Sequence, residues 1–311
     1  MTADRLALAE RILWAACGDR LRTRVSLAPL TSFRIGGPAA LYLEPQGEAD
    51  LVAAGTALRE AEIPIVVLGK GTNVLIADDG VAGLVLRLGR TYRWAARDGE
   101  RLVAGAAMPL PALAGVALSH ALTGLEFGVA IPGSLGGAVR MNAGAHGGDI
   151  AGVVESIELF DLEVGATRSI PAVEAAFTYR RSALPADGVI VGATMRLATA
   201  DATAIRGRMD EARTWRKQTQ PLAEPNCGSV FKNPSGEPAA RLVEGAGAKG
   251  LRVGGASISA KHANFIVTSP GARAVDVLEL IRQVQELVIA RTGIRLEPEV
   301  HLVGDLTPAP S

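Results

Sequence analysis

Two glycine-rich loops limit the fold of this chain more than any other feature. The first loop, residues 68–76, reads Leu-Gly-Lys-Gly-Thr-Asn-Val-Leu-Ile and lies between two apolar β runs. Its glycines let consecutive backbone N–H groups turn inward and form a concave anion site. In a Rossmann or Walker loop, a helix would follow and point its N-terminus at the phosphate. Here a strand follows, so the sequence predicts a phosphate cradle between strands rather than a nucleoside triphosphatase site.

The second loop, residues 128–148, contains seven glycines in 21 residues. With so little side-chain bulk, a flat or elongated ligand can lie directly against the backbone. Ser134 and Asn142 are the polar groups that could orient such a ligand. An isolated glycine pair more often marks a tight turn between strands. Two such loops in one domain favour a dinucleotide.

Composition narrows the class of protein. At roughly 150 residues per domain, 311 residues correspond to two or three domains. Lys and Arg total 32, as do Asp and Glu, so there is no basic surplus for nucleic acid and no such partner is expected. Two cysteines, Cys17 and Cys227, and four scattered histidines provide neither a disulfide framework nor metal-ligand spacing. Without a signal-peptide pattern or an apolar run of about 18 residues, a cytoplasmic protein with no metal and no membrane partner is predicted.

The spacing of apolar residues predicts alternating elements along the chain. Helices are expected at 4–17, 48–61, 109–122, 202–217, 238–246 and 274–291. Strands are expected at 39–44, 63–68, 73–77, 83–88, 153–161, 188–197, 229–232, 263–268 and 296–303. The apolar face of the last helix is predicted to comprise Val277, Leu280, Ile281, Val284, Leu287 and Val288, with Gly293 ending the helix. We predict a helical segment at 1–30, a first domain at 31–200 and a second, α+β domain at 201–311.

Several motifs, in order along the chain, resemble the UDP-N-acetylenolpyruvoylglucosamine reductase (MurB) family. The first loop and the run Ile-Pro-Gly-Ser-Leu-Gly-Gly-Ala-Val-Arg-Met-Asn-Ala-Gly-Ala of the second loop resemble that family's FAD-binding domain, preceded by Thr-Ser-Phe-Arg-Ile-Gly-Gly at 31–37. Segments 227–234, 249–256 and 296–300 resemble its substrate domain. The resemblance implies an α+β flavoprotein with an N-terminal FAD-binding domain of the vanillyl-alcohol-oxidase (PCMH) type and a C-terminal α+β substrate-binding domain.

The resemblance also implies an activity. The family reduces UDP-N-acetylglucosamine enolpyruvate to UDP-N-acetylmuramate in peptidoglycan precursor synthesis. NADPH reduces the bound FAD, flavin N5 gives a hydride to C3 of the enolpyruvyl group, and a proton goes to C2. The expected partner is therefore a small UDP-sugar, and the protein is expected to be a monomer or weak oligomer. No cysteine lies in either loop, so non-covalent FAD is expected.

Residue roles follow from the same resemblance. Ser229 matches the proton donor to C2, Arg180 the arginine that pairs with the substrate carboxylate, and Glu299 the glutamate that acts on the developing enolate. The expected FAD contacts are Gly69, Lys70, Gly71, Thr72, Asn73, Pro132, Gly133, Ser134, Gly137, Ala138, Asn142, Gly144 and Ala145. The expected substrate contacts are Lys217, Asn233 and His262. Taken singly, the serine reads as a turn residue, the arginine as a solvated side chain and the glutamate as an outward strand charge.

Two departures and two other hypotheses stay open at the level of sequence. His146 stands where many relatives carry tyrosine, and residues 181–200 leave no room for the tyrosine-bearing loop of one subtype. The chain therefore resembles the subtype that lacks this loop. A flavin oxidase or dehydrogenase of a small hydroxy acid is one alternative. A UDP-sugar-binding regulatory protein that has lost its chemistry is another.

Overall fold

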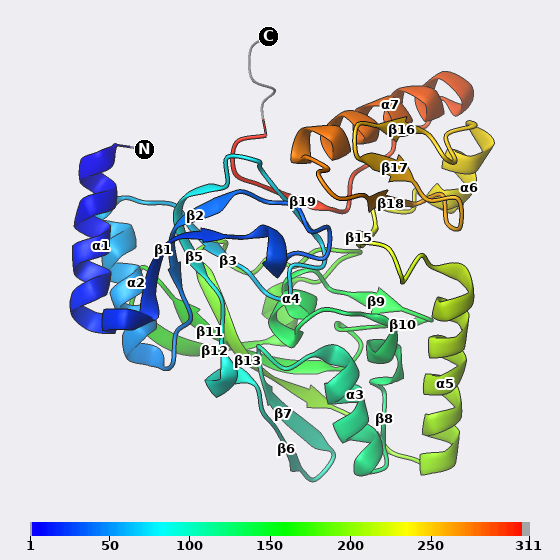
Figure 1. The fold of residues 1–311 in the computed structure, drawn as a ribbon. Coiled ribbons are helices and arrows are strands. Elements are labelled where there is room, and N and C mark those ends of the chain that lie inside the picture. The colour runs from blue at the N-terminus through cyan, green and yellow to red at the C-terminus, as the bar shows by residue number, and fades with distance from the viewer. Residues whose placement is uncertain (1, 307–311) are drawn as a thin grey trace. The chain divides into compact units, whose positions relative to one another are not determined.

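A computed structural model describes residues 2–306 of the chain, and Figure 1 shows its helices and strands. The α-helices are α1 Ala3–Cys17, α2 Glu48–Ala61, α3 Leu110–Ser119, α4 Leu135–Arg140, α5 Ala202–Thr219, α6 Ala239–Gly245 and α7 Ala274–Thr292. The first strands are β1 Leu21–Ser26, β2 Pro38–Leu43, β3 Ile65–Val67, β4 Val74–Ile76, β5 Val81–Leu86, β6 Ala95–Asp98, β7 Arg101–Gly105, β8 Leu122–Thr123, β9 Gly144–Ala145 and β10 Gly148–Asp149. The others are β11 Val154–Asp161, β12 Ala166–Pro171, β13 Gly188–Arg196, β14 Ala198–Thr199, β15 Asn226–Ser229, β16 Arg252–Val253, β17 Ala256–Ile258, β18 Phe265–Thr268 and β19 His301–Val303.

The chain folds into two compact units. Unit 1 holds residues up to 23, 40–70 and 82–216, and unit 2 holds 24–39, 71–81 and the residues from 217 onward. The two early segments belong to unit 2 because Phe33, Ile35 and Leu75 are buried in the same hydrophobic cluster as the apolar face of α7. This grouping differs from the domain bounds expected from the sequence, 1–30, 31–200 and 201–311, which stay a prediction.

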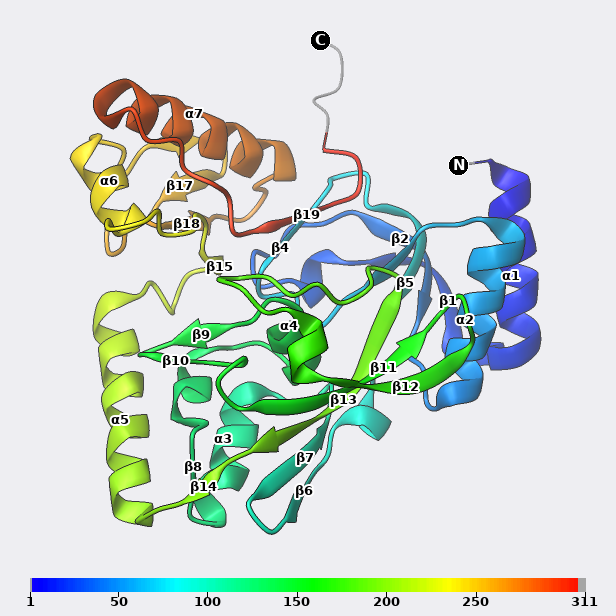
Figure 2. The same cartoon turned by 180° about the vertical axis from the view of Figure 1, so that it is seen from behind.

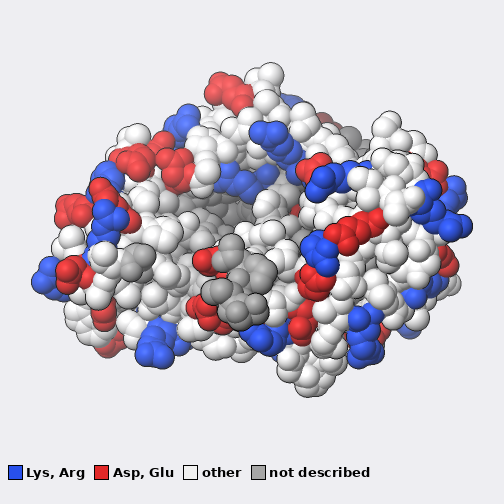
Figure 3. Space-filling view, turned by 90° about the horizontal axis from the view of Figure 1, so that it is seen from above, with Lys and Arg blue, Asp and Glu red and all other residues white. Residues whose placement is uncertain are grey.

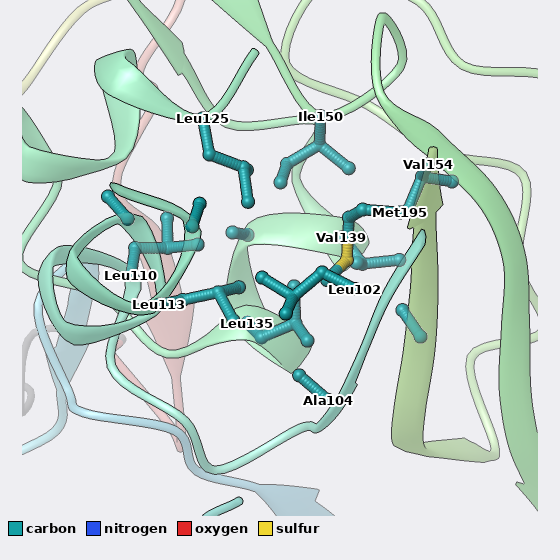
Figure 4. Packing of buried hydrophobic residues seen from close by; sticks show 14 of the residues in the cluster. Leu102, Ala104, Leu110, Leu113, Leu125, Leu135, Val139, Ile150, Val154 and Met195 are labelled. Atoms are coloured by element: carbon teal, nitrogen blue, oxygen red, sulfur yellow. The ribbon is translucent and has the colours of Figure 1, made fainter. Parts of the chain in front are cut away.

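The main sheet of unit 1 is antiparallel, in the order β12-β11-β13-β7-β6 (Figure 2). Its inward residues pack against α3 and α4 in a hydrophobic core. Figure 4 shows Leu113 of α3 and Leu135 of α4 beside Leu102 and Met195 of the sheet, and all four side chains are fully buried. A second hydrophobic cluster joins α1 and α2 to β2 and β5. Burial of this kind is the main force that stabilises a fold.

Unit 2 is built on the antiparallel sheet β15-β18-β17-β16, and β4 pairs in parallel with β19. Helix α7 packs on this sheet. The predicted apolar face of α7 is confirmed at five positions, which are buried: Val277, Leu280, Ile281, Val284 and Val288. The prediction is wrong at the sixth position, because Leu287 is 41% exposed. Gly293 ends the helix as predicted, with a φ of 74° that favours glycine.

Some elements differ from the expectations. The second loop contains α4, although two of the six residues of this helix are glycines, because burial of Leu135, Ala138 and Val139 offsets the low helix propensity of glycine. The strand expected at 229–232 lies instead at Asn226–Ser229. Residues 1–30 are not wholly helical, because β1 lies at Leu21–Ser26, a mostly exposed strand without apolar alternation. Strands β6, β7 and β12 are also absent from the predicted set, and β6 and β12 are largely exposed and lack a clear apolar alternation.

Charged side chains of both signs are interspersed over the face shown in Figure 3. This fits the equal totals of acidic and basic residues. Of the helices between residues 2 and 306, none has the length and apolar character needed to cross a bilayer.

Candidate active site

The two glycine-rich loops meet inside unit 1, at Gly69 of the first loop and Ser134 of the second. A Cβ atom built on Gly69 would lie 2.6 Å from Ser134 Oγ, well inside van der Waals contact. Ser134 is almost fully buried directly before α4. Contact this close leaves no room for a side chain at Gly69, which fits the expectation that the two loops together hold the phosphate of a dinucleotide.

Replacing Gly69 by alanine should weaken FAD binding by about tenfold, which corresponds to about 1.4 kcal/mol. The new methyl group displaces Ser134 Oγ and narrows the cradle. The measurement is the dissociation constant of FAD for the apoprotein, followed by flavin fluorescence. The control is Gly207→Ala on the exposed face of α5, where nothing lies within 4 Å of the added carbon. Equal FAD affinity of the two variants would show that Gly69 does not border the cofactor.

The other predicted FAD residues lie around these loops. In unit 1, Lys70 is exposed, and Pro132, Gly133, Gly137 and Ala138 surround the start of α4. Gly144 and Ala145 form β9, which pairs with β10. In unit 2, the carbonyl of Gly71 accepts the main-chain N–H of Ser32 (2.9 Å), and Thr72 is half-buried.

Arg180 lies in a tight turn that contacts the second loop. Thr178 and Arg181 exchange two main-chain hydrogen bonds, of 3.0 and 3.1 Å, and we name residues 178–181 the Arg180 turn. Arg180 itself has a φ of 58°, a left-handed conformation that non-glycine residues adopt at a cost of about 1–3 kcal/mol. Its Nη2 donates to the carbonyl of Gly144 (2.9 Å). The structure therefore brings the predicted carboxylate-binding arginine against the predicted FAD loop.

Arg140, which is not among the predicted site residues, fixes the segment after this turn. Its guanidinium donates to the carbonyls of Leu184 (2.9 Å), Pro185 (2.8 Å) and Gly188 (2.6 Å). Ser182 Oγ donates back to the carbonyl of Arg140 (2.8 Å). Burial lowers the pKa of Arg140. Residues 182–187 thus connect the Arg180 turn directly to β13, which agrees with the short connection seen in the sequence.

Ser229 and Glu299 lie on two segments of unit 2 that run side by side. The main-chain N–H of Glu299 donates to the carbonyl of Val230 (2.7 Å), and that of Lys232 donates to the carbonyl of Glu297 (2.9 Å). The two predicted catalytic residues are therefore brought together by a short stretch of main-chain pairing. The separation of Ser229 and Glu299 in the sequence does not indicate that the two residues are neighbours.

A β-bulge sets the direction of Ser229. Asn226 pairs with Val267 and Ser229 pairs with Phe265. The chain therefore advances three residues along β15 for two residues along β18. Gly228 lies within the bulge with a φ of 81°, and its N–H donates to Asn226 Oδ1 (3.0 Å). The extra residue re-aims the serine relative to a regular strand. The strand therefore lies at Asn226–Ser229 and not at 229–232, where the sequence predicts it.

Cys227 lies within the same bulge and is buried. Burial raises the pKa of its thiol, with a smaller effect from the charge of Glu299. A thiol of raised pKa is a poor nucleophile. Cys227 is therefore a small packed residue of the bulge rather than a nucleophile.

Asn264 holds the segment that follows Ser229. Its Oδ1 accepts the N–H of Phe231 and its Nδ2 donates to the carbonyl of the same residue, both at 2.9 Å. The carbonyl of Asn264 accepts the N–H of Val230 (2.9 Å). This buried asparagine was missed in the sequence, where an asparagine next to a histidine gives no signal of a main-chain contact 33 residues away.

The three predicted substrate contacts belong to unit 2, in different surroundings. Lys217 is exposed in the last turn of α5, and its carbonyl accepts a hydrogen bond from Lys261 Nζ (2.7 Å). Asn233 accepts the N–H of Ala239, the first residue of α6, with its Oδ1 (3.0 Å). The His262 ring packs edge-on against Phe265, with centroids 4.7 Å apart. Their contact with substrate stays a prediction.

The free energy of unfolding should fall as the pH is lowered from about 7.5 to about 5.5, through the usual pKa of histidine near 6.5. Burial lowers the pKa of His262 in the folded protein. His262 therefore resists protonation, and its stabilising effect is present above the unfolded pKa and is lost as the pH falls. His262 Nδ1 also accepts the N–H of Asn264 (3.2 Å), a bond that protonation removes.

Urea unfolding at several pH values measures this effect. His262→Asn should flatten the dependence of stability on pH. An unchanged slope in this variant would contradict the assignment.

His146, in the second loop, forms an edge-on contact with Trp215 of α5, with ring centroids 5.0 Å apart. Its φ of 50° places it in the left-handed region. Within residues 2–306, no group of three or more His, Cys, Asp or Glu is arranged to hold a metal ion.

Comparison with known proteins identifies the family. Residues 39–168 match the FAD binding domain family, and residues 220–303 match the family described as UDP-N-acetylenolpyruvoylglucosamine reductase, C-terminal domain. The chain is 45% identical over 277 residues to the UDP-N-acetylenolpyruvoylglucosamine reductase of Heliobacterium modesticaldum, covering 88% of each protein. The chain belongs to the UDP-N-acetylenolpyruvoylglucosamine reductase family. It is therefore an FAD-dependent oxidoreductase.

Further members of the reductase family support this result. The reductase of Anaeromyxobacter sp. (strain Fw109-5) is 46% identical over 288 residues, which cover 93% of this chain and 90% of that protein. The crystal structure of the reductase (MurB) from Thermus caldophilus superposes with a TM-score of 0.80 at 38% identity and covers 91% of this chain and all of its own. The predicted family is confirmed.

The predicted fold class is confirmed as well. The FAD-binding match and the Thermus reductase structure support an α+β protein with an FAD-binding domain of the vanillyl-alcohol-oxidase type and a C-terminal α+β substrate-binding domain. The solved structure named Phl p 4.0202, a glucose dehydrogenase, is similar with a TM-score of 0.51 at 14% identity, covering 92% of this chain and 63% of that one. At that identity it shows the fold alone.

Proposed function

We propose that the chain catalyses the NADPH-dependent reduction of UDP-N-acetylglucosamine enolpyruvate to UDP-N-acetylmuramate, a step in peptidoglycan precursor synthesis. The observation that carries the proposal is the paired arrangement of Ser229 and Glu299 in unit 2, within a chain about 45% identical to named reductases. Bound FAD supplies hydride chemistry, which amino-acid side chains cannot perform. The chain's own residues must bind, orient and protonate the substrate.

Arg180 is proposed to bind the substrate carboxylate. A guanidinium presents a rigid fork of N–H donors that matches a planar carboxylate. Its fixed positive charge also stabilises the negative charge that grows on the carboxylate-conjugated carbon as the alkene is reduced. The hydrogen bond to the Gly144 carbonyl uses one side of the fork and fixes its direction.

Ser229 is proposed to give a proton to C2. A serine hydroxyl is a weak acid in water, but the carbanion formed beside a carboxylate is basic enough to take its proton over a short hydrogen bond. The β-bulge at Gly228 and the two-point contact of Asn264 with Phe231 hold the serine main chain on both sides. Proton transfer depends on this fixed geometry.

Glu299 is proposed to act on the same enolate. A carboxylate is compatible with a growing negative charge only when it carries a proton or is paired with a cation. Its main chain is tied to Val230, next to Ser229. A protonated Glu299 would donate a hydrogen bond to the enolate and stabilise it.

The proposal also covers the binding of FAD, the substrate contacts, and the location and assembly of the protein. FAD is bound non-covalently by the two glycine-rich loops. Lys217, Asn233 and His262 contact the UDP-sugar, a small-molecule partner. The protein acts in the cytoplasm as a monomer or weak oligomer, without nucleic acid, membrane or metal.

The test begins with the visible spectrum of the protein as purified, without added FAD. NADPH and NADH are then titrated, and the synthetic enolpyruvyl substrate is added. The proposal expects a yellow protein that NADPH bleaches and that forms UDP-N-acetylmuramate. A colourless protein that cannot reduce the substrate would refute it. Rapid reaction with oxygen without enolpyruvyl reduction would favour the hydroxy-acid oxidase alternative, and UDP-sugar binding without turnover would favour the regulatory alternative.

A further inference from the structure

The asparagine of each glycine-rich loop donates a side-chain hydrogen bond to the main chain of a segment that carries a proposed catalytic residue. Asn142 Nδ2 donates to the carbonyl of Thr178 (3.0 Å), two residues before Arg180. Asn73 Nδ2 donates to the carbonyl of Glu299 (3.1 Å). The first contact lies within unit 1 and the second within unit 2, so the two observations are independent.

The Asn142 side chain is buried with both ends engaged. Besides the bond to Thr178, its Oδ1 accepts the N–H of Ala151 (2.9 Å). Only 4% of the residue is exposed, and its φ of 42° suits asparagine better than most other residues. A buried amide whose donor and acceptor both form hydrogen bonds holds two backbone segments together in one specific geometry.

The Arg180 turn needs hydrogen bonds of this kind to keep its backbone conformation. Arg180 has a left-handed backbone conformation, and strained residues of this kind persist only where the surrounding structure fixes them. Asn142 fixes the start of the turn, and the bond from Arg180 Nη2 to Gly144 fixes its end. Both contacts come from the second loop.

Asn73 has a corresponding place in unit 2. It directly precedes β4, and its carbonyl accepts the N–H of His301 (3.0 Å). Its side chain holds Glu299 two residues earlier on the same segment. The first loop is therefore tied to the glutamate through both the main chain and the side chain of one residue.

We propose that Asn142 and Asn73 are positioning residues, which tie the two FAD-binding loops to the segments that carry Arg180 and Glu299. The inference rests on the proposed function for the roles of that arginine and glutamate. It assigns to these two side chains the alignment of the substrate-directed groups, in place of the direct FAD contact expected from the sequence.

The test uses Asn142→Asp and Asn73→Asp in the full-length, FAD-loaded protein. Aspartate keeps the size of asparagine and its tolerance of left-handed backbone, and at position 142 it keeps an acceptor for Ala151. What is lost is the N–H donor to the carbonyl. The matched control is Arg59→Met in unit 1, which removes side-chain hydrogen bonds to the carbonyls of Leu162 (2.5 Å) and Glu163 (3.0 Å).

Two readouts are expected to change. Amide hydrogen exchange should become faster in the Arg180 turn for Asn142→Asp and in residues 297–301 for Asn73→Asp, and in neither segment for Arg59→Met. Reduction of the enolpyruvyl substrate by the pre-reduced enzyme should slow about 10- to 100-fold in each Asp variant, as expected for a misplaced group, with flavin reduction by NADPH unchanged. The Asn142→Asp defect should shrink at lower pH, because a protonated aspartate can again donate to Thr178.

Other results would overturn the inference. Loss of FAD affinity, with both half-reactions slowed together, would show that the side chains bind the cofactor. Unchanged exchange in both segments would show that neither amide holds its target. If the wild-type protein itself fails to reduce the substrate, the proposed function fails, and hydrogen exchange still decides whether the two asparagines position these segments.

Discussion

Replacing Ser229 by alanine should slow reduction of the enolpyruvyl substrate by about 10²- to 10⁴-fold, the usual contribution of a positioned proton donor. The reduction of bound FAD by NADPH should keep its wild-type rate, because that step needs no proton at C2. The two half-reactions are measured separately, by stopped-flow absorbance under anaerobic conditions. The contrast between them distinguishes a lost proton donor from a misfolded protein.

Ser269→Ala is the matched control for this experiment. Ser269 is exposed in the same unit, and its Oγ donates only to the carbonyl of Gly255 (3.1 Å), so its loss should leave both half-reactions at the wild-type rate. A Ser229→Ala variant that still reduces the substrate within a factor of about three of wild type would exclude the serine as the proton donor.

Replacing Arg180 by lysine should raise the KM of the enolpyruvyl substrate and lower kcat, with kcat/KM falling about 10- to 100-fold. Lysine keeps the positive charge but loses the planar fork, and a hydrogen bond to a charged group contributes about 1.5–3 kcal/mol. Steady-state kinetics with varied substrate at saturating NADPH measure this effect. The KM for NADPH should not change.

The adjacent residue supplies the control for Arg180→Lys. Arg181 is exposed and takes part in the turn through its main chain, so Arg181→Lys preserves the main-chain bonds with Thr178. Its kcat/KM should equal that of the wild type. If Arg180→Lys and Arg181→Lys behave alike, the arginine does not bind the carboxylate.

The sequence predicts best those elements whose apolar residues repeat regularly. Helix α2 begins and ends as expected, and five of the six residues on the apolar face of α7 are buried. Strands β6 and β12 lie at the edges of their sheet with mostly exposed residues, so their sequences carry no such pattern. Helix α4 could not be predicted from the sequence, because its glycines have low helix propensity and its formation depends on tertiary burial.

Contacts between distant residues could not be predicted in the same way. Asn73 and Glu299 are separated by 226 positions, and only the parallel pairing of β4 with β19 brings them together. An asparagine in a glycine-rich loop suggests a ligand contact as readily as a main-chain contact. The motifs therefore located the candidate site, whereas the partners that orient its residues became visible only in the structure.

A single-turnover experiment tests the central claim most directly. The FAD-loaded protein is reduced with one equivalent of NADPH without oxygen and then mixed with UDP-N-acetylglucosamine enolpyruvate. We expect the visible absorbance of oxidised flavin to return, with one UDP-N-acetylmuramate formed for each flavin reoxidised. A flavin that stays reduced until oxygen is admitted, with no product formed, would contradict the account.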